Sequence, residues 1–168
     1  EHEAAISEAQ RTGAEYPGSI LNSLILAQAY RKAERYDEAL TLLKGLLATH
    51  PKVQRTWFHI GEVHYRSRKN NVAARAAYER YLESGPTGGY KAYTLYRLGQ
   101  LDSRARNYEA AIARYEAALV IEPKFKRAQK RLDDAKRSLA KVESGGSKKR
   151  KPKRAIKARE RSRERDSK

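Results

Sequence analysis

The side chains that could do catalytic or metal chemistry are few in this 168-residue sequence. It has no cysteine, and its four histidines are His2, His50, His59 and His64. His59 and His64 would lie about 140° apart around a helix, and no HExxH pattern links them. The adjacent Asp133 and Asp134 would diverge on a helix, and neither a GxxxxGK[ST] phosphate loop nor a GxGxxG fingerprint is present. We therefore expect a protein that is not an enzyme and holds no metal or cofactor.

Positive charge is the second chemical feature, and it is concentrated towards the end of the sequence. The net charge is +17, and residues 144–168 contain twelve basic and three acidic side chains without an apolar stripe. We expect this tail to be disordered and to bind polyanions, such as nucleic acid or an acidic surface, through counterion release. The residues expected to contact an anionic partner are Lys148, Lys149, Arg150, Lys151, Lys153 and Arg154.

Two short motifs in the tail suggest specific partners. KKRKPKR resembles a nuclear localisation signal, and RERSRERDS resembles the arginine-serine tracts of RNA-processing factors. The tail has no aromatic side chain, which argues against recognition by base stacking. A solvated, solubilising tail without a dedicated partner is the alternative interpretation.

The rest of the sequence has the composition of one folded domain. Residues 1–123 hold 17 basic and 14 acidic residues, so their charge is nearly balanced. No apolar run approaches the ~20 residues that a membrane-spanning helix needs. No signal-peptide pattern opens the sequence, and without any methionine we expect a fragment of a longer chain. A cytoplasmic location is expected, or a nuclear one in a eukaryote.

Regularly spaced prolines divide the balanced part into repeats. Pro17, Pro51, Pro86 and Pro123 are separated by 34, 35 and 37 residues. Self-similarity at such a period is typical of stacked supersecondary units. Within each period, apolar residues recur at helical spacing in two blocks, which predicts two helices per unit. Each proline closes the second helix, because proline cannot continue a helix.

Corresponding positions in the units carry similar side chains. The first unit has Leu26, Ala27, Tyr30, Tyr36, Ala39, Leu43 and Leu46, the second has Trp57, Ile60, Gly61, Ala74 and Tyr78, and the third has Leu98, Gly99, Asp102, Tyr108, Ala111, Tyr115 and Ala118. This pattern resembles the tetratricopeptide repeat. We expect the small residues to mark where paired helices approach most closely, because side-chain size at a crossing sets the distance between helix axes.

The resemblance implies an all-α, right-handed α-solenoid of helix-turn-helix repeats with a capping helix. The expected segments are a half repeat at 1–17, full units at 18–53, 54–89 and 90–123, a capping helix at 124–143 and the basic tail at 144–168. The capping helix is expected because one apolar stripe, from Phe125 to Leu139, lies on an otherwise charged helix. Gly88 and Gly89 predict a loop between the second and third full units.

The same resemblance implies a concave groove lined by the first helix of each unit. The expected partner-binding residues are Leu24, Gln28, Arg31, Phe58, Glu62, Tyr65, Tyr93, Tyr96, Arg97, Gln100 and Arg104. Aromatic and arginine side chains often carry much of the binding energy at interfaces. As an alternative, Phe58 and Tyr96 pack between neighbouring units. Of the residues that grip chaperone tails in one subgroup of the family, only Arg97 is present, so that clamp is not expected.

Two functions of different kinds follow from these observations. The first is a protein-interaction scaffold that binds a peptide or a partner's helix in the groove and an anionic partner through the tail. The alternative is a nucleic-acid-associated protein whose working surface is the capping helix and tail.

Overall fold

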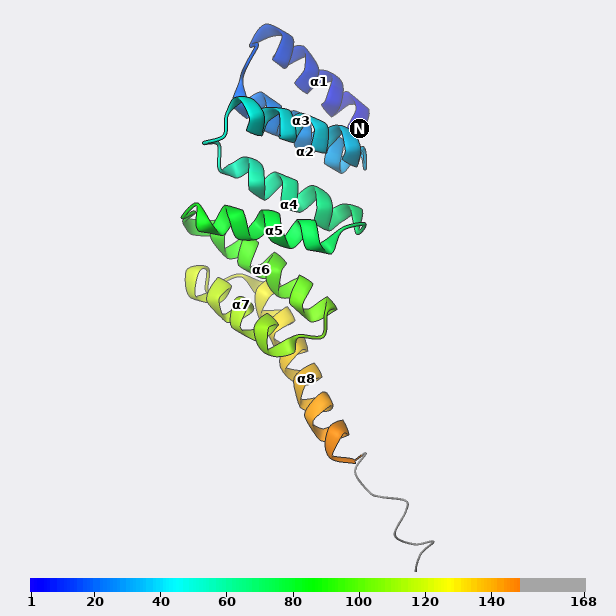
Figure 1. Cartoon of the computed structure of the whole chain (residues 1–168), viewed down its shortest axis with the longest axis vertical. Coiled ribbons are helices and arrows are strands. Elements are labelled where there is room, and N and C mark those ends of the chain that lie inside the picture. The colour runs from blue at the N-terminus through cyan, green and yellow to red at the C-terminus, as the bar shows by residue number, and fades with distance from the viewer. Residues whose placement is uncertain (149–168) are drawn as a thin grey trace, which may run out of the picture.

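The computed structural model describes residues 1–148, and in this part of the chain eight α-helices follow one another without a strand. They are α1 His2–Glu15, α2 Ile20–Lys32, α3 Tyr36–Thr49, α4 Arg55–Ser67, α5 Asn71–Glu83, α6 Gly88–Arg104, α7 Tyr108–Ile121 and α8 Lys126–Lys148. Figure 1 shows them stacked in a row, with α1 and α8 at opposite ends. The all-α solenoid expected from the sequence is confirmed.

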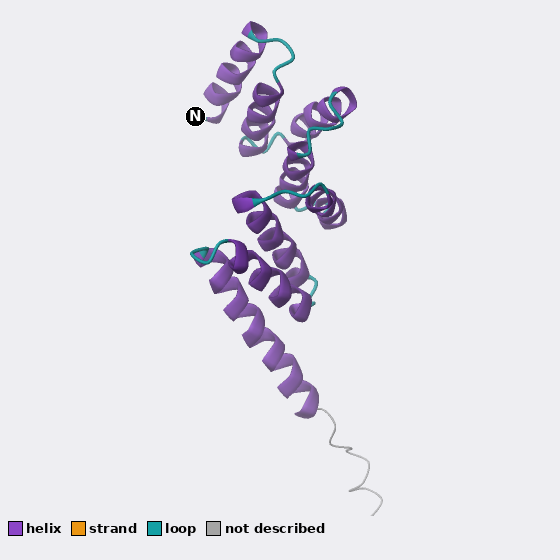
Figure 2. Ribbon diagram, turned by 90° about the vertical axis from the view of Figure 1, so that its left-hand side faces the viewer, coloured by secondary structure: helices purple, strands orange, loops and turns teal. Residues whose placement is uncertain are grey.

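The helices pack chiefly against their neighbours in the chain. α2 pairs with α3, α4 with α5, and α6 with α7, and each pair packs on the next (Figure 2). α1 contacts α2 at one end of the row, and α8 contacts α7 and α6 at the other. Such nearest-neighbour packing makes the fold quasi-one-dimensional, so each unit is stabilised by the one before and the one after it.

The turn inside each pair repeats the same backbone geometry. Glu34, Arg68 and Arg106 follow α2, α4 and α6 and have φ values of 60°, 57° and 62°. In the first and third pairs the next amide closes the helix: the N–H of Arg35 donates to Tyr30 O, and that of Asn107 to Asp102 O, both at 2.9 Å. A left-handed residue at this position satisfies the last carbonyls of a helix, which is why the chain can reverse in so few residues.

Glycine on the first helix of a pair lets a tyrosine ring of the second helix lie directly on its backbone. A Cβ atom built on Gly61 would lie 2.6 Å from Tyr78 Cδ1, and one built on Gly99 would lie 2.6 Å from Tyr115 Cε1. Both tyrosines are fully buried. The close approach predicted at these two glycines is confirmed.

The core is a strip that follows the row of helices. One cluster joins α2, α3 and α4 and includes Ala77 of α5, a second joins α4, α5 and α6, and a third joins α6, α7 and α8. The alanines predicted at helix contacts, Ala39, Ala74 and Ala111, are completely buried. Tyr78 and Tyr115 fill the space beside them, so small and large side chains alternate through the core.

The link between α5 and α6 differs from the expected loop. It comprises residues 84–87, and α6 begins at Gly88, so Gly89 lies inside the helix. Gly85 and Gly88 have positive φ values of 76° and 63°. The early start of α6 is stabilised by Tyr90, whose ring lies 5.1 Å from that of Phe58 in an edge-on contact.

α8 covers the end of the stack with the predicted apolar stripe. Ala128, Leu132 and Ala135 are buried in the cluster that α8 shares with α6 and α7. The helix continues to Lys148, beyond the expected end of the capping helix at residue 143. Among the helices of residues 1–148, none is both long enough and apolar enough to cross a membrane.

Replacing Gly99 by alanine tests the close approach between α6 and α7. The added methyl group would overlap the ring of Tyr115, a buried side chain that has little room to move. We expect Gly99→Ala to lower the free energy of unfolding by about 1–2 kcal/mol, because overpacking outweighs the better helix propensity of alanine. Urea denaturation followed by circular dichroism measures the change.

Gly45→Ala is the matched control, because Gly45 lies inside α3 with no neighbouring atom within 4 Å of a built Cβ. Here only helix propensity changes, so we expect about 0.5–1 kcal/mol of added stability. If the two substitutions shift stability in the same direction by similar amounts, the packing argument is wrong.

Candidate functional site

The eleven side chains predicted to line a groove come from α2, α4 and α6, but they differ in exposure. Six of them are buried: Leu24, Phe58, Glu62, Tyr65, Tyr96 and Arg97. Four are half-buried, namely Gln28, Arg31, Tyr93 and Gln100, and Arg104 is exposed. The surface that a partner could touch is therefore formed mainly by the last five.

The buried aromatic residues of the predicted set pack between units. The Phe58 ring lies 5.6 Å from the Tyr81 ring and 6.1 Å from the Tyr93 ring. The Tyr96 ring lies 5.0 Å from the ring of Phe125, which precedes α8. These contacts correspond to the alternative interpretation of Phe58 and Tyr96, in which the two rings join neighbouring repeats. Leu24 similarly belongs to the core cluster of α2, α3 and α4.

A buried ion pair between Glu62 and Arg97 joins α4 to α6. Arg97 Nε donates to Glu62 Oε1 at 2.7 Å, and Arg97 Nη2 donates to Glu62 Oε2 at 3.0 Å, so the contact is bidentate. The Tyr78 hydroxyl, from α5, also donates to Glu62 Oε1 at 2.6 Å. Bidentate, charge-assisted hydrogen bonds fix the angle as well as the distance between the groups. The pair therefore sets how α4 and α6 face each other.

The surroundings of this pair raise the pKa of Arg97 and that of the neighbouring Tyr78. Burial works against the charge of Arg97, but the hydrogen bonds and attraction of Glu62 raise its pKa above the ordinary value. Burial and the neighbouring Glu62 carboxylate raise the pKa of the Tyr78 hydroxyl well above its usual range, so it remains a donor. Arg31 Nη1 lies 3.9 Å from Glu62 Oε2 and adds a second, looser cation.

Hydrogen bonds continue from the ion pair along α6. Arg97 Nη1 donates to Gln100 Oε1 at 3.1 Å, and the Tyr65 hydroxyl donates to the same oxygen at 2.9 Å. Arg104 Nη2 donates to the Tyr65 hydroxyl at 2.8 Å, and both guanidinium groups lie over the Tyr65 ring, with Cζ 4.2 and 4.3 Å from its centre. The network orders long side chains that would otherwise be free, which lowers the entropic cost of binding through them.

Arginines line a large cavity between the end of α4, α6 and α8. Its volume is about 540 Å³, and Arg66, Arg68, Arg97, Arg104 and Arg131 contribute to its wall. A smaller cavity of about 250 Å³ shares Tyr65, Arg104 and Arg131 with it. Glu34 is the one acidic residue of the larger cavity's lining. The cavity is therefore suited to an anionic group.

Three of these arginines were not among the predicted groove residues. Arg66 is an exposed residue in the last turn of α4, Arg68 lies in the turn that follows, and Arg131 lies on α8. Basic residues at helix ends are common because they suit the helix dipole, so nothing in their types or spacing distinguished them. The position of Arg131 depends on how α8 folds back onto α6 and α7.

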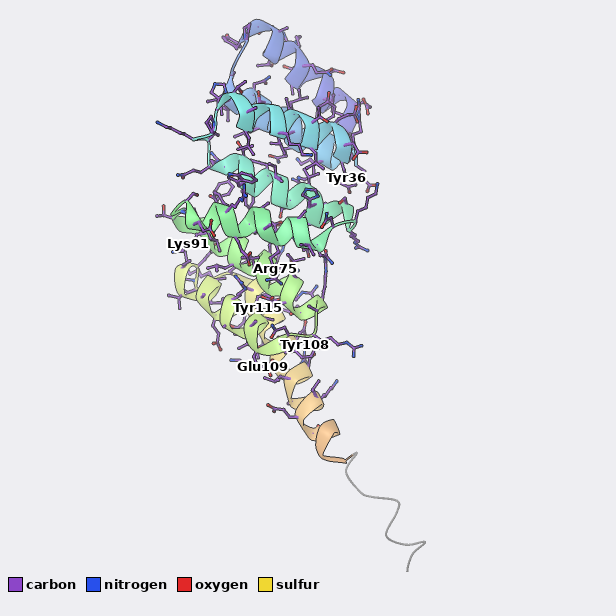
Figure 3. All side chains as sticks on the ribbon, viewed as in Figure 1. Tyr36, Arg75, Lys91, Tyr108, Glu109 and Tyr115 are labelled. Atoms are coloured by element: carbon purple, nitrogen blue, oxygen red, sulfur yellow. The ribbon has the colours of Figure 1, made fainter. Side chains whose placement is uncertain are left out.

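A second cavity lies at the opposite end of α6 and is apolar. It has a volume of about 320 Å³ and is lined by Phe58, Gly89, Tyr90 and Tyr93. Tyr90 is 41% exposed, and the guanidinium of Arg55 lies over its ring at 4.5 Å. In Figure 3, Lys91, which follows Tyr90, and Tyr36, which lines the arginine cavity, lie at opposite edges of the stack.

A separate polar cluster connects α6 to the second helices. Asp102 Oδ2 lies 2.9 Å from Arg114 Nε on α7, and Asp102 Oδ1 accepts a hydrogen bond from Arg75 Nη2 on α5 at 2.5 Å. Glu79 lies 3.6 and 3.8 Å from these two arginines. The charges in this cluster are paired within the fold, whereas Arg66, Arg68 and Arg104 of the arginine cavity have no carboxylate within 4.0 Å in the described part of the chain.

His59 is the one buried histidine within residues 1–148. Burial, together with the positive charges of Arg31 and Arg55, lowers the pKa of His59 to about 4. The residue is therefore neutral near pH 7. Among residues 1–148, no group of three or more His, Cys, Asp or Glu side chains is arranged to hold a metal ion.

The predicted anion-binding tail falls almost wholly outside the described residues. Lys148 is the last residue of α8. Lys149, Arg150, Lys151, Lys153 and Arg154 lie beyond residue 148, so their role remains a prediction.

Comparison with known proteins supports the fold and the repeat type. Residues 25–89 match the family model described as tetratricopeptide repeat. Two crystal structures of MamA protein are similar to this chain at 21% identity. One has a TM-score of 0.61 and covers 92% of this chain and 87% of its own, and the other has a TM-score of 0.62 and covers 87% and 91%. The search of curated proteins gives no match.

Removing the charge of Glu62 tests the role of the buried ion pair. Glu62→Gln leaves Arg97 buried without its counter-charge, so we expect a loss of about 3 kcal/mol in the free energy of unfolding. Urea denaturation measures it. In the double variant with Arg97→Gln the total loss should be smaller than the sum of the single losses, because the two side chains interact directly.

Glu116→Gln is the control for the loss of one carboxylate. Glu116 is half exposed and pairs with Lys136 at 2.8 Å on the surface. Surface pairs contribute little, so we expect a change below about 0.5 kcal/mol. Additive losses for Glu62 and Arg97, or equal losses for Glu62 and Glu116, contradict the assigned role.

The lowered pKa of the buried His59 predicts that the folded chain loses stability in acid. The unfolded chain protonates this histidine below about pH 6.5, whereas the folded chain does so only near pH 4. Lowering the pH through this window therefore favours unfolding by up to about 3 kcal/mol. The stability of the parent chain relative to His59→Gln should fall by that order between pH 6.5 and 4. A difference that stays constant with pH contradicts the burial argument.

Proposed function

We propose that this chain, a member of the tetratricopeptide repeat family, is a non-catalytic scaffold that binds a peptide segment of a partner protein. The binding surface is the face formed by α2, α4 and α6, which we call the groove. Its accessible residues include the half-buried Gln28, Tyr93 and Gln100 and the exposed Arg104. The observation that carries the proposal is the pair of cavities at the two ends of α6, because they are joined by ordered side chains.

The groove is already ordered in the absence of a partner. Tyr65, Arg97 and Gln100 hold one another by hydrogen bonds, and the ion pair with Glu62 anchors them to α4. Preordered aromatic and arginine side chains are effective at interfaces because little entropy is lost when a partner binds. The second helices also carry exposed apolar side chains, such as Val120 on α7 and Val72 on α5, but neither lines the two cavities at the ends of α6.

Photo-cross-linking of selected peptides tests this function. A library of random twelve-residue peptides is displayed against the full chain, and p-benzoylphenylalanine is placed at Tyr93 in the groove or at Val120 on α7. We expect the selected peptides to cross-link from position 93 and not from position 120, because Tyr93 lines the apolar cavity and contacts Arg97, which lines the arginine cavity. Mass spectrometry of the cross-linked peptide gives the result.

The position of the cross-link distinguishes the groove from the basic tail. Acidic peptides captured by residues 149–168 would not label position 93 in preference to position 120. Failure to select any peptide, or labelling from position 120 alone, contradicts the proposed function.

A further inference from the structure

The two cavities are ends of one continuous surface along α6. Tyr93 lines the apolar cavity and Arg97 lines the arginine cavity. The guanidinium of Arg97 lies over the Tyr93 ring at 4.8 Å and donates to its hydroxyl. Tyr90, Tyr93, Arg97, Gln100 and Arg104 follow one another at three- and four-residue spacing, which places them on one face of the helix.

The length of this face sets the length of the ligand. From Tyr90 to Arg104 the helix rises about 21 Å at ~1.5 Å per residue. An extended peptide covers ~3.3–3.6 Å per residue, so about six residues span the face. A small anion could fill only one end. The two ends therefore suit different side chains of one extended segment.

The apolar end suits an inserted side chain better than a nucleic-acid base stacked on an aromatic ring. Phe58 is buried, and its ring is in contact with the rings of Tyr90 and Tyr93. The Tyr90 ring is covered by the guanidinium of Arg55. These contacts occupy part of the surface of each ring, whereas base stacking needs a free ring face. What remains is a pocket with apolar walls, suited to an aromatic or long aliphatic side chain.

The basic end has positive charge that the fold does not neutralise. Arg97 is paired with Glu62, and Arg131 lies 3.7 Å from Asp134. Arg66, Arg68 and Arg104 have no carboxylate within 4.0 Å among residues 1–148. Arginine forms bidentate hydrogen bonds with carboxylates, so acidic side chains are the groups that complement this end.

The chain's own tail does not complement it. Residues 144–168 carry twelve basic and three acidic side chains, so the tail and the arginine cavity repel each other. The occupant must come from a different, acidic segment.

We propose that the groove recognises an extended acidic peptide with two features: an apolar anchor residue that enters the pocket of Phe58, Tyr90 and Tyr93, and side-chain carboxylates about four to six residues away that contact the unpaired arginines. This inference rests on the proposed function, since it specifies the peptide that the groove binds.

Fluorescence anisotropy with defined peptides and the full chain tests the inference. The probe is a labelled peptide of one phenylalanine, three serines and three glutamates, made in both orders. Its ends are acetylated and amidated, so only side-chain carboxylates are present. Changing the phenylalanine to alanine, or the glutamates to glutamines, should each weaken binding about tenfold for the preferred order, which corresponds to ~1.4 kcal/mol.

Charge-matched variants of the protein separate the cavity from the overall positive charge. The variant Arg104→Gln/Arg131→Gln removes two cations of the cavity, one on α6 and one on α8. The control Lys91→Gln/Lys130→Gln removes two exposed cations from the same helices outside the cavity. We expect the first to weaken binding about tenfold and the second less than about twofold. Circular dichroism melting checks that both remain folded.

Each outcome has a definite meaning. Equal weakening by the two double variants overturns the inference, because binding then reflects net charge. Insensitivity to the anchor or to the glutamates also overturns it, while peptides cross-linked at position 93 would leave the proposed function standing. No binding by any defined peptide overturns it as well. Displacement of the probe by a single-stranded RNA oligonucleotide, in a manner sensitive to Arg104→Gln/Arg131→Gln but not to the control, would show that the cavity serves nucleic acid instead.

Discussion

The contact between a glycine backbone and a tyrosine ring is the constraint on which the rest of this structure depends. Gly61 and Gly99 have no side chain where the rings of Tyr78 and Tyr115 lie. The distance between paired helix axes is set by the side chains at their contact, so the rings fix the spacing of both pairs in the same way. In the first full unit the corresponding positions hold Ala27 and Leu43, both buried in one cluster. There alanine stands in place of glycine on the first helix, and leucine in place of tyrosine on the second.

The choice of tyrosine connects core packing to the chemistry of the groove. The Tyr78 ring packs on Gly61, and its hydroxyl reaches Glu62, the next residue along α4. The carboxylate of Glu62 then holds Arg97 of the following unit, which orders Gln100 and Tyr65. In the next pair, the Tyr115 hydroxyl lies 3.2 Å from Ser103 Oγ. Leucine at these positions would fill the core equally well but would provide no hydroxyl for either contact.

The features that could be predicted from the sequence are those that are set within a single repeat unit. Period, helix number, the close approach at the glycines and the capping stripe all arise from spacing along the chain, and the structure contains each of them. It was harder to predict which side chains on the face formed by α2, α4 and α6 are buried. Glu62 and Arg97 are 35 residues apart, so the pattern within either unit gives no indication that their charges neutralise each other. The same reason applies to Arg131, whose place beside Arg104 follows from the packing of α8.

The early start of α6 could not be read from local preference either. Two adjacent glycines favour a loop because glycine loses much conformational freedom in a helix. The contact of Tyr90 with Phe58 and Arg55 offsets that cost and draws Gly89 into the first turn. The result extends α6 by the residues that form the apolar cavity, so a local departure from propensity creates one end of the groove.

The unpaired arginines at the other end of α6 affect both stability and binding. Like charges that face one cavity repel each other, and this repulsion opposes folding of the units that carry them. The bidentate Glu62–Arg97 contact holds α4 and α6 together against that repulsion. An anionic ligand removes the repulsion only in the folded state, where the arginines converge, so its binding also stabilises the fold. Because α4, α6 and α8 each contribute to the cavity, that stabilisation extends across two repeats and the helix that caps them.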